Sequence, residues 1–249
     1  MALRFAGKHA AVVGATGVIG SRIAQALAQQ GAAVTLLSRS VTAQRARLSA
    51  QLDPAGGPHR FLTVDVSDPA SIRDVFAGRG ADQQQQVVGL VDVLVNCAGI
   101  SQTTFLKRTP DEELARIVDT NLLATMLVCK HVRMQPHGCI INVSSLMATH
   151  GGFGATAYAA SKAGLIGFTR ALCLELAPRS IRVNALLPGW VDSDMWQRLK
   201  PELQQAFLKD TPLGRVADPA EVADAAVFLA SNQFANNCIL NLDGGLGAA

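Results

Sequence analysis

Short apolar runs rich in β-branched residues alternate along this chain with longer segments in which apolar residues recur at helical spacing. The short runs predict strands at residues 9–13, 33–38, 60–64, 91–96, 139–144, 182–187 and 239–242. Strands that alternate with helices are typical of βαβ units, in which helices cover both faces of a parallel sheet. The pattern therefore predicts an α/β fold, with one Rossmann-type domain over residues 1–249 and a doubly wound sheet of seven parallel strands.

Capping residues mark several expected helix ends. Asp68 and Asp218 each precede a proline, so a capping carboxylate is followed by a residue suited to the first helical position. Residues 109–112 and 218–221 have the spacing of a capping box. Gly31 would close the helix predicted at residues 21–30 in the left-handed conformation.

Other segments are expected to be helical as well. Long helices are predicted over residues 111–134 and 156–176, and the polar run 82–86 is expected to be a solvated helix end. Residues 193–210 combine helical period with polar and aromatic variety, which is typical of a mobile lid over a pocket.

Composition excludes several classes of protein. A chain of 249 residues, 49% hydrophobic and 16% charged, can bury a full core without disulfide or metal staples, and this excludes intrinsic disorder. The longest stretch without Asp, Glu, Lys or Arg, residues 134–161, is too rich in polar residues and glycine to span a membrane. The five cysteines are scattered, so neither a disulfide framework nor a zinc site is indicated, and a reducing compartment fits best.

The formal net charge of +3 is too small to favour nucleic-acid binding, but its distribution is uneven. No acidic residue precedes Asp53, so the first fifth of the chain is wholly basic and suited to an anionic ligand. The apolar run 9–13 begins too early to leave room for a cleaved presequence. Cytoplasmic and mitochondrial-matrix locations both remain open.

A glycine-rich turn follows the first expected strand and leads into a helix. Such a turn lets a diphosphate approach backbone N–H groups at a helix N-terminus, where the helix dipole favours negative charge. The residues predicted to form it around the cofactor are Gly14, Thr16, Gly17, Val18, Ile19 and Gly20.

The end of the second strand indicates which dinucleotide binds. An NAD site needs a carboxylate there for the adenosine ribose hydroxyls, and this chain has none before Asp53. Arg39 can instead pair with a 2′-phosphate, with Ser38, Ser40 and Arg22 as further donors. The sequence therefore predicts NADPH rather than NADH.

Tyr158 and Lys162 stand four residues apart on one face of an expected helix. The lysine charge is expected to lower the pKa of the phenol, which suits a residue that gives and takes a proton. Ser145 lies at the carboxyl end of a parallel strand, the edge at which open α/β sheets bind ligands. These three residues are the candidate reacting centre.

In this order along the chain, these residues resemble the short-chain dehydrogenase/reductase superfamily, and in finer pattern its 3-oxoacyl-[acyl-carrier-protein] reductase and carbonyl reductase branch. The pieces that carry the resemblance are residues 14–20, Asp65, residues 96–99, Asn121, Ser145, Tyr158, Lys162, residues 188–189 and residues 243–245. They cover nearly the whole chain.

The resemblance implies a role for each candidate. Tyr158 would donate a proton to a carbonyl oxygen as hydride arrives from the nicotinamide, and Ser145 would orient that oxygen. Lys162 would bind the nicotinamide ribose and lower the Tyr158 pKa, while Asn121 would hold a water in a proton relay. The cofactor would also contact Tyr158 itself, Asp65 and Val66 at the adenine, Asn96, Ala98 and Gly99 on the ribose side, and Pro188, Gly189, Val191 and Ser193 at the nicotinamide.

Two departures from the family pattern stand out. The middle glycine of its G-x-x-x-G-x-G spacing is Val18 here, and Gly17 lies one position earlier, which puts the details of diphosphate contact in question. Of two basic residues typical of docking to an acyl carrier protein, Arg179 matches one, whereas Pro136 stands at the place of the other. Arg133 is a neighbouring substitute.

Three functions remain open from the sequence. The first is an NADPH-dependent reductase of 3-oxoacyl thioesters in fatty-acid synthesis, and the second is a reductase of free ketones, quinones or steroids. The third is a non-catalytic NADPH-binding subunit of a mixed oligomer. Apolar residues beyond the needs of one sheet face, over 111–134 and 156–176, predict burial between subunits, and the resemblance implies a homotetramer or a mixed tetramer.

Overall fold

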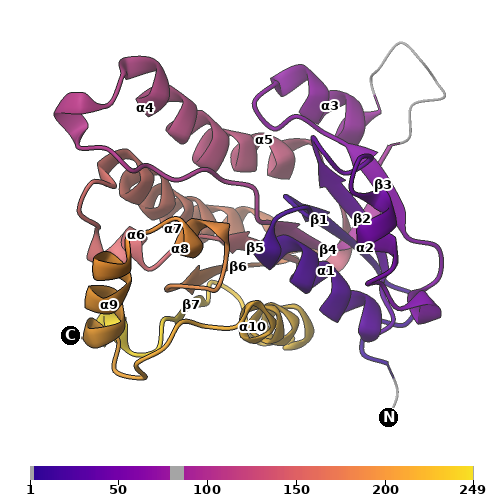
Figure 1. Cartoon of the computed structure of the whole chain (residues 1–249). Helices are drawn as coiled ribbons and strands as arrows, with labels where there is room; N and C mark the ends of the chain where they lie inside the picture. Colours follow the sequence, from indigo (N-terminus) through magenta and orange to yellow (C-terminus); the bar gives the residue numbers. More distant parts are fainter. Residues whose placement is uncertain (1–2, 79–86, 249) are drawn as a thin grey trace.

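One parallel sheet organises the molecule. The computed structural model describes residues 3–78 and 87–248, and in them seven parallel strands lie in the order β3-β2-β1-β4-β5-β6-β7 (Figure 1). The strand order reverses between β1 and β4, which opens a crevice beyond the carboxyl ends of these strands. The predicted fold class is confirmed. The strands are β1 (His9–Val13), β2 (Ala33–Ser38), β3 (Arg60–Thr63), β4 (Leu90–Asn96), β5 (Arg133–Val143), β6 (Arg182–Pro188) and β7 (Ile239–Leu242).

Helices cover both faces of the sheet. α1 and α10 pack together on one face, and α3, α5 and α7 cover the other (Figure 1). The helices are α1 (Val18–Gln29), α2 (Arg45–Ser49), α3 (Pro69–Ala77), α4 (Asp111–Val118), α5 (Ala124–His131), α6 (Met147–His150), α7 (Thr156–Leu176), α8 (Asp194–Gln197), α9 (Pro201–Asp210) and α10 (Pro219–Ser231).

The central strand β1 shows why both layers form. Successive side chains of a strand point to opposite faces, so Ala10 and Val12 pack under α1 and α10 while Ala11 and Val13 pack under the helices of the other face. All four side chains are buried. A continuous apolar run therefore fits a strand that is covered on both sides.

The helix predicted over residues 111–134 is wrong in two respects. A π-helical turn at Asp119–Leu123 separates α4 from α5, and α5 ends at His131. β5 then begins at Arg133, six residues before the predicted strand, and pairs with Leu90 and Val91 of β4.

An irregularity in β5 explains why its early start escaped sequence analysis. Four residues of β5, 135–138, lie opposite Asp92 alone on β4, and they include Pro136, which has no N–H to donate to a ladder. Met134, the second residue of β5, is buried. An apolar residue at helical spacing from its predecessors gives no local sign that it belongs to a strand.

The predicted helix ends have mixed outcomes. The Asp68 carboxylate caps α3 through Ala70 N–H, and Gly31 has φ +91°, so both predictions are confirmed. The capping box at residues 109–112 is wrong, because the Thr109 hydroxyl donates to backbone carbonyls of its own turn and α4 begins without a side-chain cap. α1 begins at Val18, three residues before the predicted start.

The capping box at the start of α10 is confirmed. Asp218 accepts from Ala220 N–H at 2.7 Å, and Glu221 accepts from Asp218 N–H at 2.8 Å. Glu221 also pairs with Arg215, and this ion pair holds the pKa of Glu221 down to about 2.

The polar run at residues 82–86 lies outside the described residues. Among residues 3–78 and 87–248, no helix is both long enough and apolar enough to cross a bilayer.

We expect Asp218→Ala to lower the free energy of unfolding by about 1 kcal/mol, because the first turn of α10 loses its cap. Asp224→Ala, an exposed change within the same helix, serves as the matched control and should stay within about 0.5 kcal/mol of the parent. Denaturant unfolding monitored by circular dichroism measures both, and equal effects of the two substitutions would contradict the capping role.

Candidate active site and cofactor cleft

The turn after β1 is in backbone contact with the loop after β4. Gly14 has φ +82°, and a Cβ atom at this position would lie 2.6 Å from the nitrogen of Ala98. A Cβ on Gly20 would lie so close to the carbonyl oxygen of Gly14 that the two atoms would overlap. Only glycine fits either position, since real Cβ contacts are never so short and the obstacle is backbone. The first and last glycines of the turn are therefore sterically required.

The first backbone N–H groups of α1, next to this turn, have no capping side chain. Gly17 is the N-cap and has no side chain to bond to the first N–H groups, and the first turn contains no acidic residue. The backbone N–H groups of Val18, Ile19 and Gly20 are thus available to an anion.

The shifted glycine does not obstruct this arrangement. Gly17 has φ −70°, and a Cβ atom there would make only an ordinary contact of 3.4 Å with the Gly14 oxygen. The side chain of Val18 is 38% exposed, so it extends outward from the helix start instead of filling the turn. The turn at residues 14–20 therefore leaves the N–H groups at the start of α1 uncovered without the family's usual glycine spacing.

The end of β2 supplies polar and basic groups next to the turn. The Ser38 hydroxyl is buried and has no hydrogen-bond partner within the described chain. Arg39 and Ser40 are exposed, and the Ser40 hydroxyl donates to the Thr16 hydroxyl at 3.4 Å. A buried hydroxyl without a partner is costly, so Ser38 is suited to bind a polar ligand group.

Arg47 is a basic residue of this region that sequence analysis did not single out. It comes from α2, and its guanidinium donates to the Thr16 carbonyl oxygen at 3.4 Å. The one feature of the sequence that pointed to Arg47 is its place in the first fifth of the chain, which has no acidic residue. Arg22, expected nearby, instead bonds to Gln25 along the exposed side of α1.

Asp65 lies after β3 and close to Arg39. Hydrogen bonds from Ser67 to its carboxylate lower the Asp65 pKa, and the charge of Arg39 adds to this effect, while burial acts in the opposite direction. Asp65 and Val66 are both half-buried. Asp65 therefore stays ionised beside the arginine expected to bind a phosphate.

Asn96 turns its side chain into the protein. The amide is buried and donates to Asn142 Oδ1 at 2.9 Å and to the Cys129 sulfur at 3.4 Å. It joins β4 to β5, and its Oδ1 is buried without a hydrogen-bond partner within the described chain. Ala98 and Gly99 follow in the loop that touches Gly14.

A cavity of about 570 Å³ opens beyond the carboxyl ends of β4, β5 and β6. Many of the predicted site residues line this cavity. Asn121 does not, and neither does most of the phosphate cradle, the turn at residues 14–20. The predicted residues in its wall are Ile19, Gly99, Ser145, Tyr158, Lys162, Pro188, Gly189, Val191 and Ser193.

Ser145, Tyr158 and Lys162 form one cluster in this wall. A side-chain hydrogen bond joins Ser145 to the Tyr158 phenol. Lys162 Nζ lies 5.8 Å from the centroid of the Tyr158 ring and donates to the Val143 carbonyl oxygen at 2.9 Å. The strand end and one helix face thus place a hydroxyl, a phenol and an amine side by side.

Burial controls the charges of this cluster. It lowers the Lys162 pKa to about 8, so the amine is largely protonated at neutral pH. Burial also raises the Tyr158 pKa, an effect that the Ser145 hydrogen bond offsets only in part. The prediction that Lys162 lowers the Tyr158 pKa is wrong for the protein by itself, because loss of hydration around the phenol outweighs its neighbours.

Asn121 lies in the π-helical turn, fully buried behind the cavity. Its Oδ1 accepts from Ile100 N–H at 2.8 Å, and its Nδ2 donates to the Ile100 carbonyl at 3.0 Å and to Ser161 Oγ at 3.0 Å. Such turns often occur at functional sites. Asn121 fixes the loop after β4 to α7, and its role in holding a water stays a prediction.

The segment expected to be a lid forms α8 and α9. Trp190 contacts Trp196 of α8 and Phe207 of α9, with ring centroids 5.6 and 4.5 Å apart. Residues 193, 195 and 199 of this segment line the cavity. An aromatic cluster thus holds this segment over the cavity, and its mobility stays a prediction.

We expect the single tyrosine of this chain to titrate above its ordinary pKa of 10 in the protein without ligands. Ser145→Ala should raise this pKa further, because the hydrogen bond from Ser145 favours the phenolate. Phenolate absorbance followed against pH measures Tyr158 alone, with circular dichroism checking the fold at each pH. Ser49→Ala, exposed on α2, is the control, and a pKa that falls in Ser145→Ala would refute the assignment.

Comparisons with known proteins show which family this chain resembles. A family model described as enoyl-(acyl carrier protein) reductase matches residues 14–247. The chain is 38% identical to a 3-oxoacyl-[acyl-carrier-protein] reductase of Escherichia coli, covering 98% of this chain and 99% of that protein. It is 40% identical to carbonyl reductase family member 4 of Danio rerio, covering 95% and 97%.

Solved structures share the whole fold. A dehydrogenase/reductase of Sinorhizobium meliloti superposes with a TM-score of 0.88 at 30% identity, covering 98% of this chain and 97% of that one. A proposed 2-deoxy-d-gluconate 3-dehydrogenase of Agrobacterium tumefaciens, solved with bound NADP, gives a TM-score of 0.86 at 30% identity and covers 100% and 99%. From its motifs, its fold and these relatives, the chain belongs to the short-chain dehydrogenase/reductase family of oxidoreductases.

Proposed function

We propose that this enzyme reduces a 3-oxoacyl thioester to the 3-hydroxyacyl product with NADPH, as a 3-oxoacyl-[acyl-carrier-protein] reductase of fatty-acid synthesis. The observation that carries the proposal is the Tyr158 phenol, hydrogen-bonded to Ser145 in the wall of a cavity and flanked by Lys162. The relative from Escherichia coli that bears this reductase name supports the choice of substrate.

The residues next to the turn after β1 fit a dinucleotide with a 2′-phosphate. Gly14 and Gly20 have no side chains that would obstruct the turn, and the uncapped start of α1 offers N–H groups to the diphosphate. The buried Ser38 hydroxyl has no hydrogen-bond partner within the described chain. Arg39 and Arg47 supply charge for the 2′-phosphate. When bound, the nicotinamide supplies the hydride, and the protein contributes binding, orientation and a proton.

Tyr158 would act as the general acid. Its raised pKa keeps the phenol protonated at neutral pH, so the proton is present when the carbonyl oxygen gains negative charge. Ser145 is placed to donate a second hydrogen bond to that oxygen. Lys162 carries a positive charge below pH about 8, which stabilises a developing phenolate and offers a donor to a ribose hydroxyl.

The position of Arg179 limits how a carrier protein could dock. Its guanidinium bonds to the Met134 carbonyl at the amino end of β5, beside Arg133, whereas Tyr158 lies near the start of α7 at the opposite edge of the sheet. The 21 residues of α7 span about 30 Å. Docking through Arg179 would therefore serve the active site of another copy in a tetramer.

Exposed apolar residues support such an assembly. Leu123, at the end of the π-helical turn, and Leu174 of α7 are exposed, and Phe234 is 97% exposed. Leu165, in a segment expected at a subunit contact, is buried within its own chain and so is not available to contact another subunit. A homotetramer is proposed, and a mixed tetramer remains the alternative.

A second candidate is reduction of free ketones, quinones or steroids by the same residues. The relative from Danio rerio named carbonyl reductase family member 4 favours it. Trp190, Met195 and Leu199 give the cavity an apolar wall that suits either substrate. Steady-state kinetics with acetoacetyl-carrier protein against a panel of free ketones separates the two candidates.

We expect NADPH to exceed NADH in kcat/KM by at least about tenfold. Arg39→Ala should raise KM for NADPH and leave KM for NADH unchanged, because only the 2′-phosphate loses its partner. Arg116→Ala, an exposed arginine of α4 away from β2, is the control. Equal efficiency with both cofactors in the parent enzyme would contradict the proposal.

We expect Tyr158→Phe to lower kcat for acetoacetyl-carrier protein by at least about a hundredfold, because the general acid is lost. Affinity for NADPH, followed by fluorescence of the bound nucleotide, should change little. A variant that keeps more than about a tenth of the parent rate would exclude Tyr158 as the proton donor.

A further inference from the structure

The helix that carries Tyr158 has no cap of its own. α7 begins at Thr156 after Ala155, whose side chain has no hydrogen-bonding atom. Ala159 N–H bonds to the Ala155 carbonyl, which leaves N–H groups earlier in the first turn to be satisfied from elsewhere. Tyr158 itself belongs to this turn.

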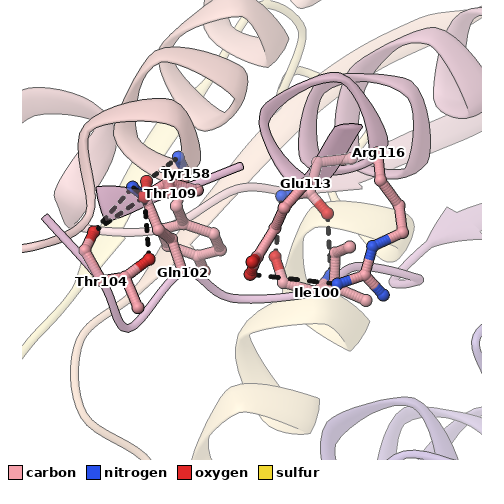
Figure 2. Close-up of polar contacts among 8 residues, drawn as sticks. Ile100, Gln102, Thr104, Thr109, Glu113, Arg116 and Tyr158 are labelled. Carbon is pink, nitrogen blue, oxygen red and sulfur yellow. Dashed lines mark hydrogen bonds and ion pairs between the residues drawn. The ribbon is translucent and has the colours of Figure 1, made fainter. Parts of the chain in front are cut away.

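Gln102, from the loop after β4, provides the missing acceptor. Its Oε1 accepts from Ala157 N–H at 2.8 Å and from Tyr158 N–H at 3.4 Å, 55 and 56 positions later in the chain. Figure 2 shows Gln102 between the first turn of α7 and the turn that contains Thr104 and Thr109. A side chain far away in sequence thus caps the helix.

The other end of the Gln102 amide is equally well fixed. Its Nε2 donates to the Thr104 carbonyl at 2.9 Å and to the Thr109 hydroxyl at 3.1 Å. The same hydroxyl lies 2.8 Å from the Thr104 hydroxyl, so the turn forms a small closed network (Figure 2). Gln102 is 6% exposed, yet it belongs to the cavity wall. Its oxygen therefore cannot easily point elsewhere.

The backbone of Tyr158 is held at both of its polar groups. Gln102 accepts from its N–H, and Ser161 Oγ donates to its carbonyl at 2.7 Å. Ser161 in turn accepts from Asn121, which fixes Ile100, two residues before Gln102. The loop after β4 and the start of α7 are thus joined through two side-chain amides. A small displacement of an acid from its substrate costs much of its rate.

We propose that Gln102 is a positioning residue for Tyr158, which it acts on by capping the first turn of α7. This inference rests on the proposed role of Tyr158 as proton donor. The sequence gives no sign of it, since Gln102 is not close to Tyr158 along the chain and its capping geometry exists only in the folded loop.

The test compares Gln102→Met, which keeps the side-chain length but loses the amide, with Gln102→Glu, which keeps an oxygen acceptor for the two N–H groups. Gln29→Met, exposed on α1, is the matched control. We expect Gln102→Met to lower kcat about tenfold with KM for NADPH unchanged. Gln102→Glu should recover only part of this loss, because a carboxylate oxygen replaces Nε2 and then faces the Thr104 carbonyl oxygen to which Nε2 donated.

Action through Tyr158 is tested by a double-mutant cycle. In a Tyr158→Phe background, Gln102→Met should leave the residual rate unchanged, since there is no longer a phenol to position. An equal loss in both backgrounds would overturn the proposal, because Gln102 would then act on the cavity or the fold. If Gln102→Met does not fold, Gln102→Asn, which is too short to reach both sides, replaces it.

A readout without substrate separates this inference from the proposed function. Amide hydrogen exchange at Ala157 and Tyr158 should be about fivefold faster in Gln102→Met than in the parent or in Gln29→Met. Unchanged exchange would refute the capping, whatever the enzyme reduces. Faster exchange in a protein that reduces no carbonyl would leave the cap established and reject the proposed function.

Discussion

Contact between the backbones that follow β1 and β4 is the constraint on which the site depends. Gly14 lies so close to Ala98 that a single Cβ atom would force the two loops apart. The loop after β4 is bonded to Asn121 through Ile100, and its Gln102 side chain reaches the start of α7. The turn proposed to bind the diphosphate on one side and the proposed proton donor Tyr158 on the other are therefore positioned against the same loop.

Burial sets the chemistry within that frame. The same loss of hydration lowers the Lys162 pKa to about 8 and raises the Tyr158 pKa, so at neutral pH the cluster holds a protonated amine beside a protonated phenol. Among the neighbours, the Cys97 thiol stays neutral because burial raises its pKa to about 11. The lysine then faces no thiolate from Cys97, and its charge is available to the phenol and to a ligand.

Amide side chains do much of the positioning around this cluster. Asn121 fixes the loop at Ile100, and Gln102 fixes it again at the first turn of α7. Both side chains are buried and both use the oxygen and the nitrogen of the amide, which satisfies their polar groups inside the protein. Such two-ended bonds restrict rotation more than an apolar contact of the same size would.

The sequence by itself determined the fold class and indicated the candidate reacting groups. Alternating apolar runs located the strands, glycines marked the turn after β1, and the Tyr158–Lys162 spacing indicated a candidate reacting centre, because each of these signals is local in the chain. Only the tertiary structure decided the early start of β5, the inward turn of the Asn96 side chain, the direction of the Tyr158 pKa shift and the contact of Gln102 with the first turn of α7. These depend on burial and on partners tens of residues away, and a linear pattern does not contain the distances that fix them.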